Sequence, residues 1–371
     1  MRRLFLLLVL PVIGLVSCVY NEEGSGIVPL PPPELKYVGS DACGSCHPTQ
    51  HTTFSESGHP YKLSEVDGIA PTYPFTTLDH VPDGYSWDDI SYVIGGYAWR
   101  ANYIDDEGYI ITGDDAQWNY QTGEAGPYHA GVNPGTEKYE CGACHTTGWK
   151  SVANGGSPQG DMPGMDGEFF AGGIQCEACH GMGSFHLSSK STEDITIDRE
   201  SEACGQCHSS NGDGIIAASE GFIHNYEQYN EMSAAGHTDL SCNDCHDPHV
   251  TVKHDQVGGI IQVCTDCHTE ITTGAEHRGA DCLTCHMPYA SKSAVSTNKY
   301  VADLKTHIFK INPAEDGIMF NVDSTQVNGE NGVTLDFVCY QCHKDEAGIG
   351  GEKSEKTMSR LSGKATGYHT P

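Results

Sequence analysis

Cys43-Gly44-Ser45-Cys46-His47 is the stretch around which the rest of this 371-residue chain is organised. Its pattern is two cysteines, separated by two residues and followed directly by histidine, and it occurs eight times. We number these motifs one to eight in chain order; motifs two to eight are Cys141/Cys144/His145, Cys176/Cys179/His180, Cys204/Cys207/His208, Cys242/Cys245/His246, Cys264/Cys267/His268, Cys282/Cys285/His286 and Cys339/Cys342/His343. Of the 17 cysteines, Cys18 alone lies outside the motifs.

This spacing is the signature of covalent c-type haem attachment. Two thiols add across the two vinyl groups of one haem, so they must sit about one helical turn apart, and the adjacent histidine becomes the proximal iron ligand. Zinc binding gives no reason for a histidine after every second cysteine. A disulfide framework would explain an even count but not the fixed triplet. The sequence therefore predicts eight covalent haem c groups with their iron, and the proximal ligands His47, His145, His180, His208, His246, His268, His286 and His343.

The composition suits a core made of haem rather than of aliphatic side chains. Only 37% of the chain is hydrophobic, and 44 residues are glycine, which lets the backbone pass close to a porphyrin face. We predict the fold class of a multihaem cytochrome c, mostly irregular, with short α-helices, a small β insert and the haem stack as core. The formal net charge of −30 argues against nucleic acid as a partner. The acidity fits simple solubility, or attraction to basic partners and metal cations.

The first residues have the anatomy of an export signal. Arg2 and Arg3 precede a short apolar run that is too short to span a membrane comfortably. The run ends in Leu-Val-Ser-Cys at position 18, which resembles the bacterial lipobox. We predict a lipoprotein signal peptide at residues 1–17 and lipidation of Cys18, so that the protein is an exported, membrane-anchored lipoprotein on the periplasmic side or outer surface. The alternative is an ordinary secretory signal with an incidental cysteine.

Motif spacing divides the remaining chain. Residues 18–36 contain Gly and Pro and are expected to form an extended, lipid-anchored tether. Residues 37–140 hold motif one and an aromatic insert, with a capped helix after Ser86 that ends at Gly95 and a hairpin around Asp105–Gly108. This insert is a docking surface or a structural flap, and the flap is favoured. Residues 141–299 form a dense core with motifs two to seven. Residues 300–371 carry a β-rich patch (319–338), motif eight and a helical tail (356–369).

Each iron also has a sixth coordination position, and twelve histidines remain to fill these positions. Such a surplus predicts His/His ligation of most or all haems. His51, His80 and His254 are predicted not to be ligands, and Met287 is expected to pack against a porphyrin. Local context selects nine candidates for the distal ligand: His59, His129, His186, His224, His237, His249, His277, His307 and His369.

Several short strings around the motifs resemble a known family. They are Gly173-Ile-Gln-Cys-Glu-Ala-Cys-His-Gly181 with Ser184 and His186, Cys242 to His249, Cys282 to Pro288, and His307-Ile-Phe-Lys-Ile-Asn312. The chain resembles the bacterial multihaem c-type cytochromes of dissimilatory metal and sulfur metabolism, with cytochrome c554-like segments. The resemblance implies that the flanking histidines are distal ligands and that the haems form chains of stacked and T-shaped pairs.

Two functions remain open on the sequence. The favoured one is an octahaem electron carrier, not an enzyme, which exchanges electrons with other redox proteins (cytochromes, porin–cytochrome or quinol-linked donors) or with extracellular acceptors. A filament or another oligomer is a special case of it. The alternative is a multihaem reductase of nitrite, hydroxylamine or a sulfur oxyanion. All eight motifs are regular, whereas related enzymes usually mark the catalytic haem by a departure from the pattern, and saturated His/His ligation would favour electron transfer.

Overall fold

The computed structural model describes residues 34–210, 214–234, 236–271, 277 and 280–369, and the backbone of two short strands before them. The predicted signal peptide lies outside these residues, as does the side chain of Cys18. The chain divides into one unit of residues 1–36 and a second unit of residues 37–371. In the part that the structure describes, no helix is both long and apolar enough to cross a bilayer.

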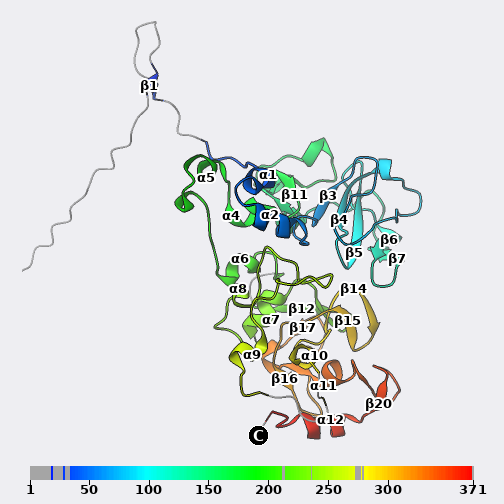
Figure 1. The fold of residues 1–371 in the computed structure, drawn as a ribbon. Coiled ribbons are helices and arrows are strands. Elements are labelled where there is room, and N and C mark those ends of the chain that lie inside the picture. Colours follow the sequence, from blue (N-terminus) through cyan, green and yellow to red (C-terminus); the bar gives the residue numbers. More distant parts are fainter. Residues whose placement is uncertain are drawn as a thin grey trace, which may run out of the picture. The chain divides into compact units, whose positions relative to one another are not determined.

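The helices of the second unit are short (Figure 1), and none among the described residues exceeds eight residues. Each of the eight motifs lies on, or at the end of, one of these helical turns, which matches the expected separation of the two thiols. The helices are α1 (Ser40–Gly44), α2 (Pro48–Ser55), α3 (Gly142–His145), α4 (Cys176–His180), α5 (Ser184–Ser189), α6 (Ser201–Gly205), α7 (Gln228–Ala234), α8 (Cys242–Cys245), α9 (Cys264–Cys267), α10 (Cys282–His286), α11 (Leu335–Cys339) and α12 (Met358–Ala365).

An antiparallel sheet of five strands fills the gap between motifs one and two. Its order is β3 (Leu63–Glu65), β4 (Ile90–Gly95), β5 (Arg100–Asp105), β6 (Gly113–Asn119) and β7 (Glu124–Tyr128). Its core is rich in buried tyrosine, including Tyr73, Tyr97 and Tyr103. The predicted hairpin around Asp105 is confirmed, because Gly108 N donates to Asp105 O at 3.1 Å and Ile104 pairs with Ile110.

The predicted helix ending at Gly95 is wrong. Ser86 does form a capping box with Asp89, but the helix is one 3-10 turn, Trp87–Asp89, and the chain becomes β4 at Ile90. Ile90 and Val93 pack into one cluster of the sheet and Tyr92 into another. Because both faces of this strand are buried, β-branched and aromatic side chains favour the extended conformation there.

A second sheet of five strands lies between motifs four and eight, and it was not predicted. Its order is β15 (Val301–Leu304), β14 (Ser291–Asn298), β13 (Phe222–His224), β12 (Ile216–Ser219) and β17 (Gln326–Val327). Strands β13 and β14 are parallel, and the cluster below them includes Ile223, Ile308 and Phe337. The patch predicted as β-rich supplies only β17 and β18 (Val333–Thr334) before α11 begins.

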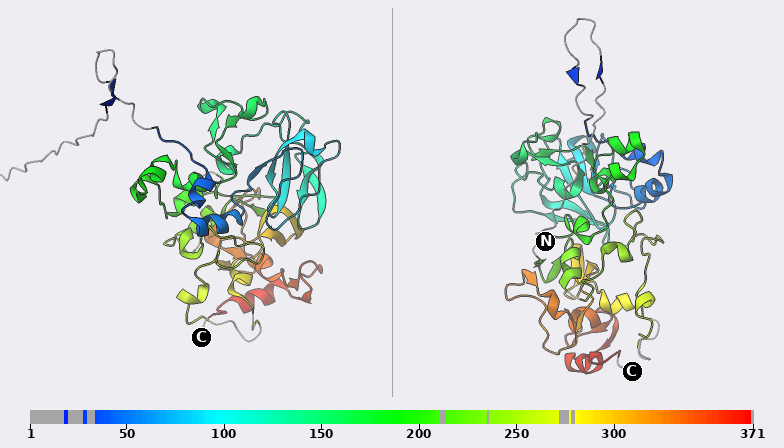
Figure 2. Two further views of the ribbon diagram at one scale, coloured as in Figure 1. Left: turned by 45° about the horizontal axis from the view of Figure 1, so that its top comes forward. Right: turned by 90° about the vertical axis from the view of Figure 1, so that its left-hand side faces the viewer.

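Two-stranded pairs complete the fold. They are β8 (Thr146–Thr147) with β11 (Ala171–Gly172), β9 (Lys150–Ser151) with β10 (Gly167–Glu168), β16 (Ile311–Asn312) with β18, and β19 (His343–Lys344) with β20 (Lys353–Glu355). The predicted tail helix is confirmed as α12, the red helix near the C-terminus in Figure 2. It packs against α11. Strands β1 (Cys18–Val19) and β2 (Val28–Pro29) pair with each other in the first unit.

Candidate haem sites

One continuous cavity runs through the second unit, and all eight motifs line it. Its volume is about 5240 Å³, and both cysteines and the histidine of every motif face it. A pocket for a single small molecule measures roughly 300–1,000 Å³. The space therefore fits several macrocycles in contact with one another.

Six of the eight motif histidines face a second histidine ring across this cavity. With metal–nitrogen bonds of about 2 Å, and a ring centre about 1 Å behind each nitrogen, two imidazoles on opposite sides of one iron lie about 6 Å apart. The side chains therefore fit a six-coordinate haem. The pairs and the distances between their ring centres are His47–His186 (6.2 Å), His59–His208 (6.5 Å), His180–His249 (6.2 Å), His237–His268 (6.1 Å), His246–His307 (6.3 Å) and His286–His369 (5.8 Å).

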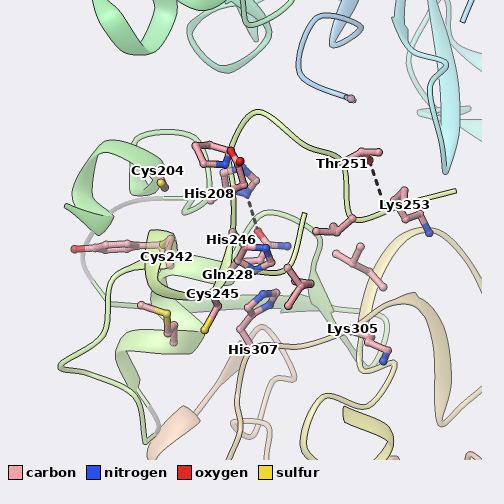
Figure 3. Close-up of a pocket in the computed structure, with 18 of the residues that line it drawn as sticks. Cys204, His208, Gln228, Cys242, Cys245, His246, Thr251, Lys253, Lys305 and His307 are labelled. Atoms are coloured by element: carbon pink, nitrogen blue, oxygen red, sulfur yellow. Dashed lines mark hydrogen bonds between the residues drawn. The ribbon is translucent and has the colours of Figure 1, made fainter. Parts of the chain in front are cut away.

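Hydrogen bonds orient many of these rings by their Nδ1 atoms, which leaves Nε2 to face the cavity. Among motif histidines, Nδ1 of His180 lies 2.7 Å from Thr196 O, and Nδ1 of His208 lies 3.1 Å from Gln228 Oε1 (Figure 3). Across the cavity, Nδ1 of His186 lies 2.8 Å from Ser191 O. An imidazole whose Nδ1–H is held in this way presents Nε2 as a metal ligand of fixed direction.

The three histidines predicted not to be ligands use the opposite nitrogen. Nε2 of His80 contacts Asp115 O at 3.1 Å, and Nε2 of His254 contacts Tyr97 O at 3.0 Å. Nε2 of His51 lies 3.6 Å from Asp41 Oδ1. None of the three has its Nε2 turned toward a motif histidine.

Burial keeps several of the paired rings in the form that binds a metal. It lowers the pKa of His59 and of His307 to about 3. Lys62 and other neighbouring cationic or imidazole groups lower the pKa of His59 further. These rings are neutral at physiological pH, and neutral imidazole is the ligating species.

Three of the nine candidates for the distal ligand do not face a motif histidine. His129 is exposed and stacks on Tyr128, and its Nδ1 lies 2.5 Å from Glu137 Oε1. Both ring nitrogens of His224 are hydrogen-bonded, to Tyr226 and to Ser219. Nδ1 of His277 lies 3.2 Å from Tyr368 Oη. All twenty histidines belong to the described part of the chain, and there no imidazole lies opposite His145 or His343.

The surroundings of His145 are cationic instead. Its Nδ1 lies 3.1 Å from Lys62 O, and burial, followed by the charge of Lys62, lowers its pKa to about 4. Burial also lowers the pKa of Lys62, and the nearby Arg100 guanidinium lowers it further. Arg100 donates to Gln117 Oε1 at 3.3 Å. The described residues show no carboxylate ion pair for either cation.

Sequence reasoning missed these two cations. The usable signal was their scarcity, because the whole chain has only 20 Lys and Arg residues against 50 Asp and Glu. Scarcity alone does not predict that these two cations lie near His145, because their positions depend on the path of β5.

Cysteine contacts show which motifs are neighbours. Hydrogen bonds join the thiols of Cys144 and Cys207 and those of Cys204 and Cys242; they lower the pKa of Cys144 to about 7 and that of Cys242 to about 6. Burial, followed by the charge of a nearby thiol, raises the pKa of Cys43 near Cys176, of Cys264 near Cys282 and of Cys285 near Cys342. For Cys245 the cause after burial is the charge of Asp244, and Cys267 comes next.

These contacts arrange the motifs in an unbroken order. Motif one lies near motif three, and motifs four to eight are neighbours in turn. Motif three joins this series through Cys179, whose charge acts on Cys204 and Cys207. Motif two is attached to motif four as a side branch. Backbone packing agrees, because α1 packs on α4, α6 on α8 and α10 on α11.

The short helices around one shared cavity have the fold of the multihaem c-type cytochromes. Residues 117–181, which span motifs two and three, match the family model of cytochrome c554 and c-prime. A relative, the multihaem cytochrome MtrA of Shewanella baltica (strain OS185), is 27% identical over 146 residues, which is 34% of this chain and 39% of MtrA. The chain thus aligns with about two fifths of the length of this relative.

Two solved structures have a similar fold. The outer cell wall cytochrome OcwA matches with a TM-score of 0.55 at 18% identity, over 88% of this chain and 86% of OcwA. The octahaem sulfite reductase MccA of Wolinella succinogenes matches with a TM-score of 0.57 at 18% identity, over 92% of this chain and 68% of MccA. At such identity the likeness extends to the fold alone.

Proposed function

We propose that the protein is an exported octahaem cytochrome that carries electrons along its series of haems. The observation that carries this proposal is the single cavity that all eight motifs line, together with the packing of their helices on one another, since haems attached at neighbouring motifs would lie close together. Eight haem c groups would be held by the sixteen motif cysteines, and the motif histidines would be proximal ligands. Motifs one and eight would then be the two ends of the path, where other redox proteins or extracellular acceptors would exchange electrons.

The six histidine pairs support electron transfer rather than bond making. Imidazole on both faces leaves an iron no free position for a substrate, and it holds the coordination geometry fixed as the charge changes. The Nδ1 hydrogen bonds add to this rigidity, because they keep each ring in one orientation. A path of such haems needs no movement of side chains to pass an electron.

Redox titration of the purified, intact protein tests the proposal. Intact mass is expected to exceed that of the processed chain by eight haem units. The reduction of these haems, followed by visible absorption, should spread over a broad range of potential, because closely spaced charged sites interact. A single sharp step accounting for all eight haems would show that the haems do not interact, and a mass with fewer haems would contradict the count.

Membrane attachment through Cys18 is part of the proposal. The expected result of Cys18→Ser is release of most of the protein from the membrane to the soluble fraction, since a multiply acylated cysteine would be the anchor. Fractionation followed by intact mass checks it, with Ser17→Ala as a control that retains the cysteine. Membrane association that persists in Cys18→Ser would contradict lipidation as the anchor.

A second candidate function is reduction of a small anion at motif two. The observation that favours it is the environment of His145, whose pKa is lowered by burial and then by the nearby charges of Lys62 and Arg100, and which has no second imidazole opposite it among the described residues. An iron held there would keep one coordination position for a ligand, and the two cations would favour an anion such as nitrite or a sulfur oxyanion. Through Cys144 and Cys207, motif two would draw electrons from motif four.

A further inference from the structure

Glu177 is the one acidic residue in this chain that directly follows the first cysteine of a motif. It lies in α4 between Cys176 and Cys179, and it is only 4% exposed. Asp244 and Asp266 stand one position later in motifs five and six, are exposed, and each caps the start of its own helix. The hydrogen-bond partners of Glu177 lie outside its helix, so its role is not local capping.

Three backbone N–H groups from two other segments converge on this carboxylate. Oε1 accepts from Gly183 N at 2.7 Å and from Val38 N at 2.9 Å, and Oε2 accepts from Gly39 N at 2.9 Å. Because both oxygens act as acceptors, the group is held as a carboxylate, and hydrogen bonds to an ionised group are the shorter and stronger kind. The ion pairs of the described residues do not include Glu177.

Two of these donors begin the helices that hold the site of motif one. Gly39 immediately precedes α1, which carries Cys43, and its φ of +84° lies in the region that favours glycine. Gly183 immediately precedes α5, which carries His186, and the ring centre of His186 lies 6.2 Å from that of His47. One side chain of motif three therefore fixes both sides of the motif-one site.

Neutral contacts support the same packing. Ser40 Oγ donates to Gln175 Oε1 at 2.9 Å, and α1 packs on α4. Nδ1 of His186 is held 2.8 Å from Ser191 O without any contribution from Glu177. Substitution of Glu177 is therefore expected to shift these elements by a small amount rather than to unfold them.

The buried charge also has an electrostatic consequence. Ferric haem carries one more positive charge than ferrous haem, so a negative charge nearby favours the oxidised state and lowers the reduction potential. Solvent and salt screen such an effect at the surface, whereas Glu177 is removed from water and lies between the two cysteines of motif three. Its charge therefore acts on the haems attached at motifs one and three.

We propose that Glu177 positions the haem site of motif one and lowers the potentials of the haems at motifs one and three. This inference rests on the haem attachment set out under the proposed function, and it adds a residue outside the set of iron ligands. Because motif one is one end of the proposed path, the carboxylate sets the potential at which electrons pass through that end.

Potentiometric titration of the full, haem-loaded chain, followed by electron paramagnetic resonance of the low-spin ferric signals, tests this proposal. Glu177→Gln removes the charge but keeps the shape, and it is expected to raise the potential of one or two haems and to shift the g-values of one. Glu177→Asp keeps the charge but shortens the side chain, so g-values should shift while potentials stay closer to those of the parent protein. The matched control is Glu202→Gln, which should change neither, because Glu202 lies two residues before Cys204 and is exposed.

The outcomes separate this inference from the proposed function. If Glu177→Gln keeps eight haems by intact mass and has the potentials and g-values of the parent protein, the inference is wrong and the proposed electron path stands. If Glu202→Gln raises a potential as much as Glu177→Gln does, the effect is one of net charge, and the buried carboxylate has no special role. If Glu177→Gln is recovered with fewer haems, Glu177→Asp decides: shifted g-values support the positioning role, and unchanged g-values overturn it. A parent protein with fewer than eight haems contradicts the proposed function itself.

Discussion

Replacing His249 with alanine is expected to convert one haem, that of motif three, from low spin to high spin while the others stay unchanged. The two rings of His180 and His249 are almost parallel, at 5°, with centres 6.2 Å apart, so they fit opposite faces of one iron. Nδ1 of His249 also lies 3.1 Å from Asp247 Oδ1, which directs Nε2 into the cavity. Alanine has no donor atom, and the iron would be left with one imidazole or with water.

Electron paramagnetic resonance of the oxidised protein measures this change, and intact mass verifies the haem content. The matched control is His254→Ala, five residues along the same loop, whose Nε2 contacts the backbone of Tyr97. The control variant is expected to have the same number of low-spin haems as the unmutated protein. A high-spin signal of equal size in both variants would mean that the loop, and not the ligand, determines the spin state.

The motifs themselves were fully predictable, because the chemistry of attachment fixes their spacing along the chain. Six of the nine histidines chosen from local context also face a motif histidine in the structure. Their partners could not be predicted from local context, since His59 faces a histidine of motif four and His307 one of motif five. These pairings depend on how distant segments of the chain pack around the cavity. The few residues around each histidine do not determine that packing.

The same limit explains the misplaced elements. Strands β13 and β14 pair in parallel, and the chain between them includes motifs five to seven. Because such a pair is not joined by a short turn, the sequence has no hairpin pattern that predicts the second sheet. The predicted cap at Ser86 is present, but the helix predicted to follow it is a strand from Ile90 onward. Burial of side chains on both faces of this strand outweighs the capping residues. Only the tail helix, with a Thr357 side chain that accepts from Arg360 N, combined a local cap with one buried face.

The unmutated protein is expected to contain a high-spin haem at motif two and to bind small anions there. Lys62 and Arg100 lie near His145, and an anion bound to the iron would gain from both charges in a buried setting. Hydrogen bonds to charged groups contribute about 1.5–3 kcal/mol each. Lys62→Met or Arg100→Met is therefore expected to weaken nitrite or sulfite binding by about tenfold to a hundredfold.

A neutral ligand separates charge recognition from simple access to the iron. Carbon monoxide binding to the reduced protein should change little in Lys62→Met, because that ligand has no charge for the ammonium group to stabilise. Lys292→Met is the control cation, since its ammonium is paired with Glu220 at 2.6 Å on the surface. Anion affinity is followed optically through the high-spin band, and turnover through consumption of nitrite, hydroxylamine or sulfite by the reduced protein. If the unmutated protein has no high-spin haem, motif two also belongs to the electron path and the reductase candidate is excluded. If the protein binds and reduces the anion, electrons leave the series of haems through motif two, which branches from motif four.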